Sequence, residues 1–386
     1  MNKVYIVDGC RTPIGKKNGK LSTYLPEKLG AAVMNRLLGR NALKPKNIDE
    51  VFLGNAIGPG GNIARLSLLE AGWDQSIPAT TIDFQCGSGM KSIFVAYYMI
   101  KASEANLVIA GGVESTSLEP MRRYNNKDPK FEGEAVFYSK AQFSPFILGD
   151  PDMLTGAEKT GELFGLSRDD MDRWALMSHK RAIEAKYENK LKDVIISLDG
   201  DSQISDESIR EKMSMRLLAK AAPVVKPGGN ITSGNSCLTH DGACALLLAS
   251  QEAVEKYNLK PIAIIEAVGS IGVNPNYPPV GAINVVKKLL NERKLTSNQI
   301  DVYEVNEAFA VKILGFIKEL GISEETINLW GGALAYGHPY GASGAIITLH
   351  LAEILKKDNK ERGIAAIGVA GGQGAAIMIR NITKDE

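Results

Sequence analysis

An internal duplication constrains the fold of this 386-residue chain more than any other feature of its sequence. Residues 48–56 (IDEVFLGNA) resemble residues 300–308 (IDVYEVNEA), and both segments are typical of a loop followed by a buried strand. Cys86 lies thirty-eight residues after the start of the first segment, and His338 lies thirty-eight residues after the start of the second. This equal spacing favours two related halves over a chance likeness between two ordinary βαβ segments.

Each half continues with the same order of elements. A turn of small residues opens a helix, at 90–99 or 346–355, that is apolar around most of its circumference, as expected of a helix buried between layers. A strand that ends in glycines follows each helix, at 107–112 and 365–372. Strands that alternate with helices predict βαβ units and mostly parallel sheets, stacked around a shared layer of helices.

The predicted domain organisation follows from the duplication. We expect an N-terminal domain over residues 1–255 and a C-terminal domain over residues 256–386. Within the first domain, residues from about 116 to 231 are rich in charge and include amphipathic helices such as 168–187. We interpret this segment as an insertion that covers the core, where loops that contact a ligand are expected.

The composition excludes several classes of protein. Apolar residues make up 44% of the chain and charged residues 23%, which is typical of a globular protein. The formal net charge of +1 predicts no general affinity for nucleic acid or for a membrane surface, and no apolar run is long enough to span a bilayer. The start of the chain does not resemble a signal peptide, and four cysteines are too few for a disulfide framework, so we expect a cytoplasmic protein with reduced thiols.

Cys86 is the strongest candidate for a nucleophile. It lies between a predicted strand and a predicted helix, so we expect it at a helix N-terminus, where unpaired N–H groups and the helix dipole lower the pKa of a thiol. Gly87 and Gly89 would let the backbone turn sharply and leave room for a substrate. A buried structural cysteine is the alternative, and the spacing alone does not decide between the two.

His338 and Asn306 are candidate partners of this cysteine. His338 lies among glycines beside a proline, so its ring is expected at a loop tip, where it could hydrogen-bond a thiolate or a carbonyl oxygen. Asn306 follows an apolar strand and could orient a water molecule or donate to a developing oxyanion. A turn histidine that faces water and a helix N-cap are the respective alternatives.

Metal, phosphoryl and hydride chemistry lack their usual signals. Cys237, His240 and Cys244 have a spacing that metal ligands could adopt, but no fourth ligand is evident, so we predict no metal site. The sequence also contains no P-loop and no dinucleotide-binding fingerprint.

Four motifs, taken in order, make the chain resemble the thiolases (acetyl-CoA acetyltransferases and 3-ketoacyl-CoA thiolases). They are Cys86-Gly87-Ser88-Gly89, Asn306-Glu307-Ala308-Phe309, Gly337-His338-Pro339 and Gly371-Gly372-Gln373-Gly374. Each motif is weak alone, whereas the ordered set, which covers nearly the whole chain, is specific. The resemblance implies an α/β architecture, namely a duplicated thiolase fold of five layers, αβαβα, with an inserted loop domain.

The resemblance also implies an activity in fatty acid metabolism, with coenzyme A thioesters as substrates and no further cofactor. Cys86, activated by His338, would take an acyl group from an acyl-CoA. Acetyl-CoA would then react with this acyl group to give a 3-ketoacyl-CoA, or the reverse reaction would cleave one. Asn306, through a water molecule, and His338 would stabilise the enolate oxygen, and the N–H groups of Cys86 and Ala370 would hold the tetrahedral oxyanion.

Coenzyme A contacts and assembly are further implications of the resemblance. Arg210 looks like the arginine that packs on the CoA adenine in this family, and Ser236 is a second expected CoA contact. The family pattern also implies a homodimer or a homotetramer.

Two departures from the family pattern bear on the chemistry. Gly368 stands where thiolases carry a second cysteine, so the usual base for the acetyl α-carbon is missing. Cys237 stands where the family has a serine near the thioester, and it either supplies the missing acid/base thiol or merely packs. An acyl-CoA hydrolase or acyltransferase without carbon–carbon chemistry, and a non-catalytic CoA-binding protein, are therefore alternative functions.

Overall fold

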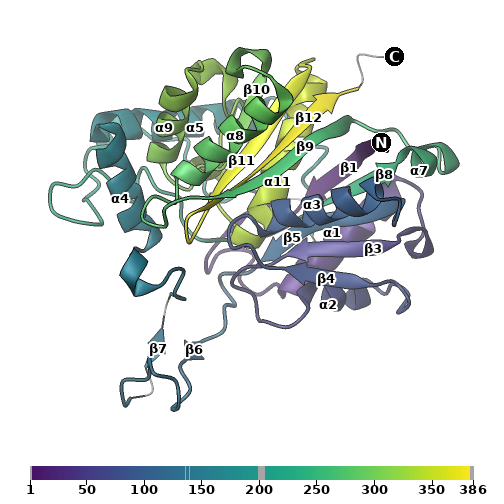
Figure 1. Cartoon of the computed structure of the whole chain (residues 1–386), viewed down its shortest axis with the longest axis horizontal. Helices are drawn as coiled ribbons and strands as arrows, with labels where there is room; N and C mark the ends of the chain where they lie inside the picture. Colours follow the sequence, from purple (N-terminus) through teal and green to yellow (C-terminus); the bar gives the residue numbers. More distant parts are fainter. Residues whose placement is uncertain (1, 135, 139, 199–204, 383–386) are drawn as a thin grey trace.

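The computed structural model describes residues 2–134, 136–138, 140–198 and 205–382 of the chain. One mixed sheet runs through both halves (Figure 1). Its strands are β1 (Val4–Arg11), β2 (Gly15–Lys16), β3 (Glu50–Gly54), β4 (Ala79–Ile82), β5 (Leu107–Glu114), β8 (His240–Ser250), β9 (Ala263–Gly272), β10 (Val302–Val305), β11 (Arg362–Val369) and β12 (Gln373–Asn381). The strand order is β10-β11-β12-β9-β1-β8-β5-β3-β4, and β2 pairs with β8.

The arrangement of strands repeats in the two halves. In the first half β3 is parallel to β5, β5 is antiparallel to β8, and β8 is antiparallel to β1. In the second half β10, β11, β12 and β9 follow the same series of orientations. Strands β1 and β9 pair through Tyr5 and Ile264 and so join the halves into one sheet. The predicted duplication is confirmed.

The prediction of mostly parallel strands is wrong. Among the described strands, parallel pairing is confined to β3 with β4, β3 with β5 and β10 with β11. The connection between β11 and β12 shows the reason, because Gly371 and Gly372 turn the chain back on itself with φ of 77° and 76°. Such φ values favour glycine, and strands joined by a tight turn lie antiparallel.

Helices cover the sheet in three layers (Figure 1). They are α1 (Pro26–Arg40), α2 (Ile63–Glu70), α3 (Ser88–Lys101), α4 (Met153–Phe164), α5 (Arg168–Tyr187), α6 (Met215–Leu218), α7 (Gln251–Lys256), α8 (Val280–Arg293), α9 (Ala310–Leu320), α10 (Ala333–Tyr336) and α11 (Tyr340–Lys357). Helices α3 and α11 share one buried core with both halves of the sheet, whereas α1 and α2 form a second core and α8 and α9 a third.

Alternate residues of single strands face different cores, which defines the layers. In β8, Leu246 and Leu248 belong to the central core with α3 and α11, whereas Leu247 and Ala249 belong to the core with α1 and α2. Successive side chains of a strand point to opposite faces of the sheet, so this pattern places one helical layer on each face of the first half. Strand β11 alternates in the same way between the central core and the core with α8 and α9, so the two halves of the sheet form two β layers on either side of α3 and α11. The five-layered αβαβα arrangement is confirmed.

Glycines let the two central helices approach closely. A Cβ atom on Gly89 of α3 would lie 2.7 Å from the carbonyl oxygen of Gly341 of α11, and a Cβ on Gly344 would lie 2.5 Å from the backbone nitrogen of Met90. Any larger residue at Gly89 or Gly344 would push the two helix N-termini apart. Cys86 and His338 each precede their helix by two residues, so this crossing holds the two loops at the same end of the central layer.

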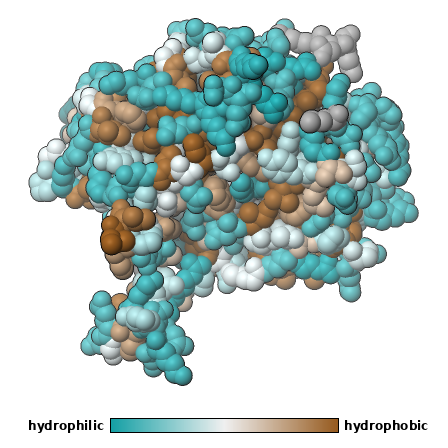
Figure 2. Space-filling view, viewed as in Figure 1, coloured by the Kyte–Doolittle hydropathy of each residue, from teal (hydrophilic) through white to brown (hydrophobic). Residues whose placement is uncertain are grey.

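The segment predicted as an insertion, residues 116–231, extends outward from this core. Its short strands β6 (Arg122–Arg123) and β7 (Phe137–Tyr138) pair antiparallel and project from the body (Figure 1). Apolar surface gathers where this projection meets the body (Figure 2), and the side chains of the 3₁₀ helix η2 (Phe146–Leu148) are exposed. None of the helices within the described ranges combines the length and apolar character that crossing a membrane requires. The domain boundary at residue 255 stays a prediction.

Candidate active site

A sharp turn places Cys86 just before α3. Gln85 has a φ of 47°, and the hydroxyl of Ser88 accepts a hydrogen bond of 2.8 Å from the backbone N–H of Phe84. A Cβ on Gly87 would lie 2.7 Å from the Phe84 ring and 2.9 Å from the Val369 side chain, so this position requires glycine. The turn therefore packs against the end of β11, and Cys86 comes to lie beside the backbone of Ala370.

Burial controls the proton on Cys86. Desolvation raises the pKa of the thiol to about 11, although the Lys312 ammonium and the backbone N–H groups of Cys86 and Ala370, which hydrogen-bond the sulfur, act in the opposite direction. The expectation that the helix N-terminus leaves this thiol with a low pKa is therefore wrong, because the cost of burying a thiolate is larger. The resting sulfur is a neutral thiol near pH 7.

The ring of His338 is buried and held on one side only. Its Nδ1 lies 2.6 Å from the hydroxyl of Ser343, and that hydroxyl donates to the carbonyl oxygen of Pro339 at 2.8 Å. Since the single hydroxyl proton is used on Pro339, we assign the ring proton to Nδ1, which leaves Nε2 as a lone-pair acceptor. Nε2 is buried and has no hydrogen-bond partner among the described residues.

His338 is neutral as well as oriented. Burial lowers the pKa of the imidazole well below its usual value, and the positive charge of Lys312 and the neighbouring His240 lower it further. A neutral ring with a free Nε2 can accept a proton from a thiol nearby. The alternative of a turn histidine that faces water is wrong, because the side chain is buried in the described structure.

Asn306 bridges the histidine and a buried lysine. It follows β10, and its backbone N–H donates to the carbonyl oxygen of Ala366 at 3.0 Å. Its Nδ2 lies 3.3 Å from Nδ1 of His338, which is a contact between two donors in the assigned tautomer, and its Oδ1 accepts a hydrogen bond of 3.3 Å from Nζ of Lys312. The N-cap alternative is wrong, because α9 begins at Ala310 with another residue as its cap.

Cys237 faces the same cluster from the segment that precedes β8. Its backbone N–H donates to the carbonyl oxygen of Ala308 at 2.9 Å, which fixes it beside the loop that carries Asn306. Burial raises the pKa of the Cys237 thiol to about 12, against the opposing effect of the Lys312 ammonium, and negative charge on Cys86 would raise it further. The hydroxyl of Ser236 is buried here and has no hydrogen-bond partner among the described residues.

The structure thus brings together the five residues predicted for the chemistry, namely Cys86, His338, Asn306, Cys237 and Ala370. The sequence did not indicate Lys312, which is fully buried at the start of α9 and interacts with the thiols of Cys86 and Cys237. Its signal in the sequence is a single lysine in the otherwise apolar run 308–317.

Glu307 is a second residue that sequence analysis missed. This buried carboxylate accepts hydrogen bonds from Trp174 and Ser178 of α5 at 3.0 and 2.6 Å, and from the side-chain amide of Asn328 at 2.8 Å. These bonds lower the pKa of Glu307, while burial, the larger effect, raises it. Glu307 therefore attaches the inserted helix α5 to the loop that carries Asn306.

Arg210 lies at a separate opening and not in the cluster. Its side chain is exposed, and its backbone N–H donates to Nδ1 of the buried His179 at 3.2 Å. The opening has a volume of about 320 Å³ and is lined by Arg210, Lys212, Met213, Leu217, Leu218, Ala221, Ser233 and Gly234. Ser233 and Gly234 lead directly along the chain to Ser236 and Cys237.

Two other groups of residues carry no site. Cys237, His240 and Cys244 do not converge, since Cys244 interacts with Cys10 in the core. Within the described ranges no three His, Cys, Asp or Glu side chains are placed to share a metal ion.

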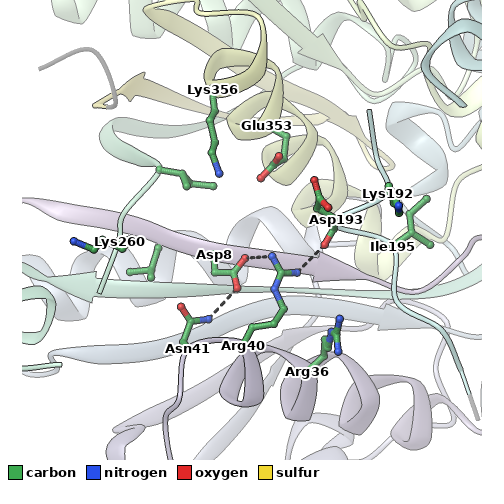
Figure 3. A pocket seen from close by; sticks show the side chains of 12 residues that line it. Asp8, Arg36, Arg40, Asn41, Lys192, Asp193, Ile195, Lys260, Glu353 and Lys356 are labelled. Carbon is green, nitrogen blue, oxygen red and sulfur yellow. Dashed lines mark hydrogen bonds and ion pairs between the residues drawn. The ribbon is translucent and has the colours of Figure 1, made fainter. Parts of the chain in front are cut away.

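A surface hollow elsewhere (Figure 3) has acidic and basic groups that pair with each other, such as Arg40 with Asp8 at 2.8 Å. None of the predicted site residues lines it.

The duplicated sheet and the buried central helices, with a cysteine and a histidine before neighbouring helix N-termini, define an α/β protein of the five-layered αβαβα class. Two family models match this chain: the N-terminal domain of thiolase over residues 4–252 and the C-terminal domain of thiolase over residues 259–381. The chain belongs to the thiolase family.

Individual relatives agree with this assignment. The chain is 40% identical to "Putative acetyl-CoA C-acetyltransferase YhfS" of Bacillus subtilis, over 98% of this chain and 99% of that protein. It is similarly covered, at 37% identity, by "Putative acetyl-CoA C-acetyltransferase VraB" of Staphylococcus aureus, over 98% and 99% of the two chains.

Solved structures show the same fold. The crystal structure of the Bacillus anthracis acetyl-CoA acetyltransferase superimposes with a TM-score of 0.93 at 31% identity and covers 99% of each chain. The human mitochondrial 3-ketoacyl-CoA thiolase in complex with CoA gives a TM-score of 0.92 at 30% identity and covers 99% of this chain and 98% of its own.

Proposed function

We propose that the chain is an acyl-CoA acyltransferase that forms or cleaves a 3-ketoacyl-CoA through a thioester on Cys86. The environment of one sulfur atom carries this proposal. The thiol of Cys86 receives two backbone N–H groups, from Cys86 itself and from Ala370, and both this thiol and the His338 ring, with its free Nε2, interact with the buried Lys312. A nucleophile, a base and two donors for an oxyanion are the parts that acyl transfer requires.

In the first step, His338 Nε2 takes the thiol proton while Sγ of Cys86 attacks the carbonyl carbon of the acyl-CoA. The new carbon–sulfur bond sends the carbonyl electron pair to the oxygen, which the N–H groups of Cys86 and Ala370 hold as an oxyanion. Collapse of this intermediate breaks the bond to CoA and leaves the acyl group on Cys86. The CoA sulfur leaves with the electron pair and takes a proton from a second acid of the site, Cys237 or Lys312. A neutral thiol and a neutral imidazole suit this step, because the proton moves only as the new bond forms.

In the second step, the group that protonated the CoA sulfur acts as a base and takes a proton from the α-carbon of an acetyl-CoA, and the resulting enolate attacks the acyl group on Cys86. His338 now carries the proton on Nε2 and can donate it in a hydrogen bond to the enolate oxygen, with Asn306 acting through a water molecule. The bond to Cys86 then breaks and the sulfur regains its proton from His338. Thiolysis is the same series of steps in reverse.

The proposed CoA site is the opening beside Arg210. The cationic side chains of Arg210 and Lys212 suit the phosphates of CoA, and Met213 and Leu217 offer apolar surface to its adenine or pantetheine. The unpaired hydroxyl of Ser236 lies between this opening and Cys237 along the chain and is a proposed CoA contact. The relative solved with CoA supports the ligand class.

Intact-mass spectrometry after incubation with acetyl-CoA tests the proposal. We expect a mass increase of one acetyl group in the wild type and in Cys10→Ala, whose thiol is buried in a different core. We expect no increase in Cys86→Ala. A wild type that gains no acetyl group would favour a non-catalytic CoA-binding protein instead.

A further inference from the structure

A buried lysine in the site has no obvious structural reason to be there. Lys312 is 0% exposed and is the third residue of α9, where the positive end of the helix dipole disfavours a cation. Within the described ranges no carboxylate forms an ion pair with its ammonium group. The one hydrogen bond that this group makes there runs to Oδ1 of Asn306 at 3.3 Å. A buried cation without a counter-ion destabilises a fold, so a functional explanation is required.

The end of this lysine lies where a side chain of residue 368 would begin. A Cβ placed on Gly368 would be 3.5 Å from Cε of Lys312 and only 2.9 Å from the carbonyl oxygen of Pro278. A cysteine at position 368 would therefore approach the backbone before α8 too closely, and its side chain would be in contact with the lysine.

The charge of Lys312 acts on the two thiols and on the imidazole of the site. Cys86 before α3 and Cys237 before β8 both interact with its charge, as does His338 before α11. Of these groups, Cys86 would carry the acyl group and His338 would hold the proton taken from it. Among these four groups, Lys312 and Cys237 remain to act on the second substrate.

The pKa values of Cys237 and Lys312 distinguish these two candidates. Burial raises the pKa of the Cys237 thiol to about 12, so this thiol is rarely ionised near neutral pH. Burial acts on an amine in the opposite direction and lowers the pKa of Lys312 to about 8. An acid–base group works best when its pKa lies near the working pH, which favours the lysine.

We propose that Lys312 is the catalytic acid and base of the carbon–carbon step, giving a proton to the departing CoA sulfur and then taking one from the α-carbon of acetyl-CoA. The inference rests on the proposed acyl transfer through Cys86. It goes beyond that proposal because it assigns the α-proton to a residue that the sequence resemblance does not mark.

The proton balance closes over one cycle. At rest Lys312 is an ammonium and His338 is neutral. After acyl transfer His338 holds the thiol proton, and Lys312 has protonated the CoA thiolate and is a neutral amine. When a C–H bond of acetyl-CoA breaks, its proton goes to the amine and its electron pair forms the enolate. The enolate attacks the acyl carbon, the sulfur of Cys86 leaves and takes the proton of His338, and the site returns to its starting state with one positive charge throughout.

Hydrogen–deuterium exchange at the acetyl group tests the inference. Acetyl-CoA is incubated with the full-length protein in deuterated water, the label on the methyl group is followed by mass spectrometry, and the acetyl group on Cys86 is measured in the same samples. Lys312→Met removes the amine and keeps most of the volume. Lys318→Met is the matched control, since Lys318 is an exposed lysine of the same helix. Its ammonium group donates a hydrogen bond to the carbonyl oxygen of Phe164.

We expect Lys312→Met to acetylate Cys86 more slowly than the wild type, because the departing CoA sulfur lacks its proton donor, but still to reach the acetylated state, which shows that the variant is folded. Exchange per acetylated protein should fall by about 10²- to 10⁴-fold. Exchange by the wild type and by Lys318→Met should rise as the pH passes upward through about 8, because only the neutral amine accepts a proton. That rise should be absent in Lys312→Met.

Four results would overturn the inference. Exchange by Lys312→Met at the wild-type rate would exclude the lysine, and loss of exchange in Cys237→Ala but not in Lys312→Met would assign the role to the thiol. A wild type that acetylates Cys86 but exchanges no deuterium would leave the acyl transfer standing without a carbon–carbon step. A wild type that never acetylates Cys86 would instead sink the proposed function and the inference together.

Discussion

The protonation states of the site residues depend more on burial than on position at a helix N-terminus. Cys86 lies at the N-terminus of α3, yet desolvation raises the pKa of its thiol to about 11. His338 is buried too, and desolvation lowers the pKa of its ring. Both shifts remove charge, so the resting pair is thiol and imidazole and not thiolate and imidazolium. Acylation of Cys86 should therefore require proton transfer to His338 as the bond forms.

A prediction at this scale concerns stability. Burial lowers the pKa of Lys312 from the usual 10.5 to about 8, a difference worth about 3 kcal/mol. The unfolded chain binds this proton more tightly than the folded chain, so the fold loses stability as the pH falls from about 10.5 to about 8. Lys312→Met should consequently raise the free energy of unfolding at pH 7 by about 3 kcal/mol, and this gain should shrink toward pH 10.

Urea denaturation of the wild type, Lys312→Met and Lys318→Met at pH 7 and pH 10 measures this effect. The exposed Lys318 should behave like the wild type at both pH values, within about 0.5 kcal/mol. A stabilised but inactive Lys312→Met would mean that the lysine is kept for function at the expense of the fold. If Lys312→Met is less stable than the wild type at pH 7, the lysine has a structural role instead.

The sequence predicted some of these residues and not others, for a physical reason. Cys86, His338 and Asn306 stand beside glycines or at the ends of apolar strands, which marks them as loop residues near helix starts. Lys312 stands inside an amphipathic helix, where a lysine normally faces water. Its burial depends on the packing of α9 against α8, α5 and α4, and no local pattern encodes that.

At the scale of elements, the crossing of α3 and α11 builds the site. The glycines at the crossing let the helix N-termini meet, and the loops before them carry Cys86 and His338. The equal spacing of thirty-eight residues predicted that a helix follows both Cys86 and His338, which is confirmed. Most of the small residues interpreted as a turn before each helix lie inside it instead, because α3 begins at Ser88 and α11 at Tyr340. The spacing did not predict strand direction, because that depends on the turn between β11 and β12 and on long-range pairing.

Gly89→Ala tests the role of this crossing. The new methyl group would lie 2.7 Å from the carbonyl oxygen of Gly341, so the helices must separate. Overpacking of this kind typically costs about 1–3 kcal/mol of stability. We also expect slower acetylation of Cys86, since the thiol moves away from His338.

Gly39→Ala is the matched control, because its new methyl group would meet no atom within 4 Å in the exposed last turn of α1. This change should be neutral or stabilising by up to about 1 kcal/mol. Thermal unfolding and the rate of acetylation report both effects. Equal behaviour of the two alanine variants would show that the close approach of α3 and α11 is not needed.

On the scale of the whole molecule, neither half contains a complete site. Cys86 comes from the first half, whereas His338, Asn306, Lys312 and Ala370 come from the second. Pairing of β1 with β9 joins the two halves, and the shared core around α3 and α11 fixes them relative to each other. Duplication thus supplies two similar helix N-termini, one used for a nucleophile and the other for a base.

Assembly is a further prediction for the whole molecule. The family resemblance implies a homodimer or homotetramer, and Ile147 of η2 is 93% exposed beside the exposed Phe146 and Leu148. Exposed apolar groups of this size usually mark a contact. We expect Ile147→Asp to lower the mass measured by light scattering relative to the wild type, with acetylation of Cys86 intact. An unchanged mass would show that η2 is not part of a contact between copies.

The central claim is that Cys86 carries the acyl group, and its most direct test is to locate that group. The protein is mixed with acetyl-CoA, quenched in acid to preserve thioesters, digested and mapped by mass spectrometry. The account predicts an acetyl group on the peptide that contains Cys86, in the wild type and in Lys312→Met. An acetyl group on Cys237 instead, or on no cysteine at all, would contradict it.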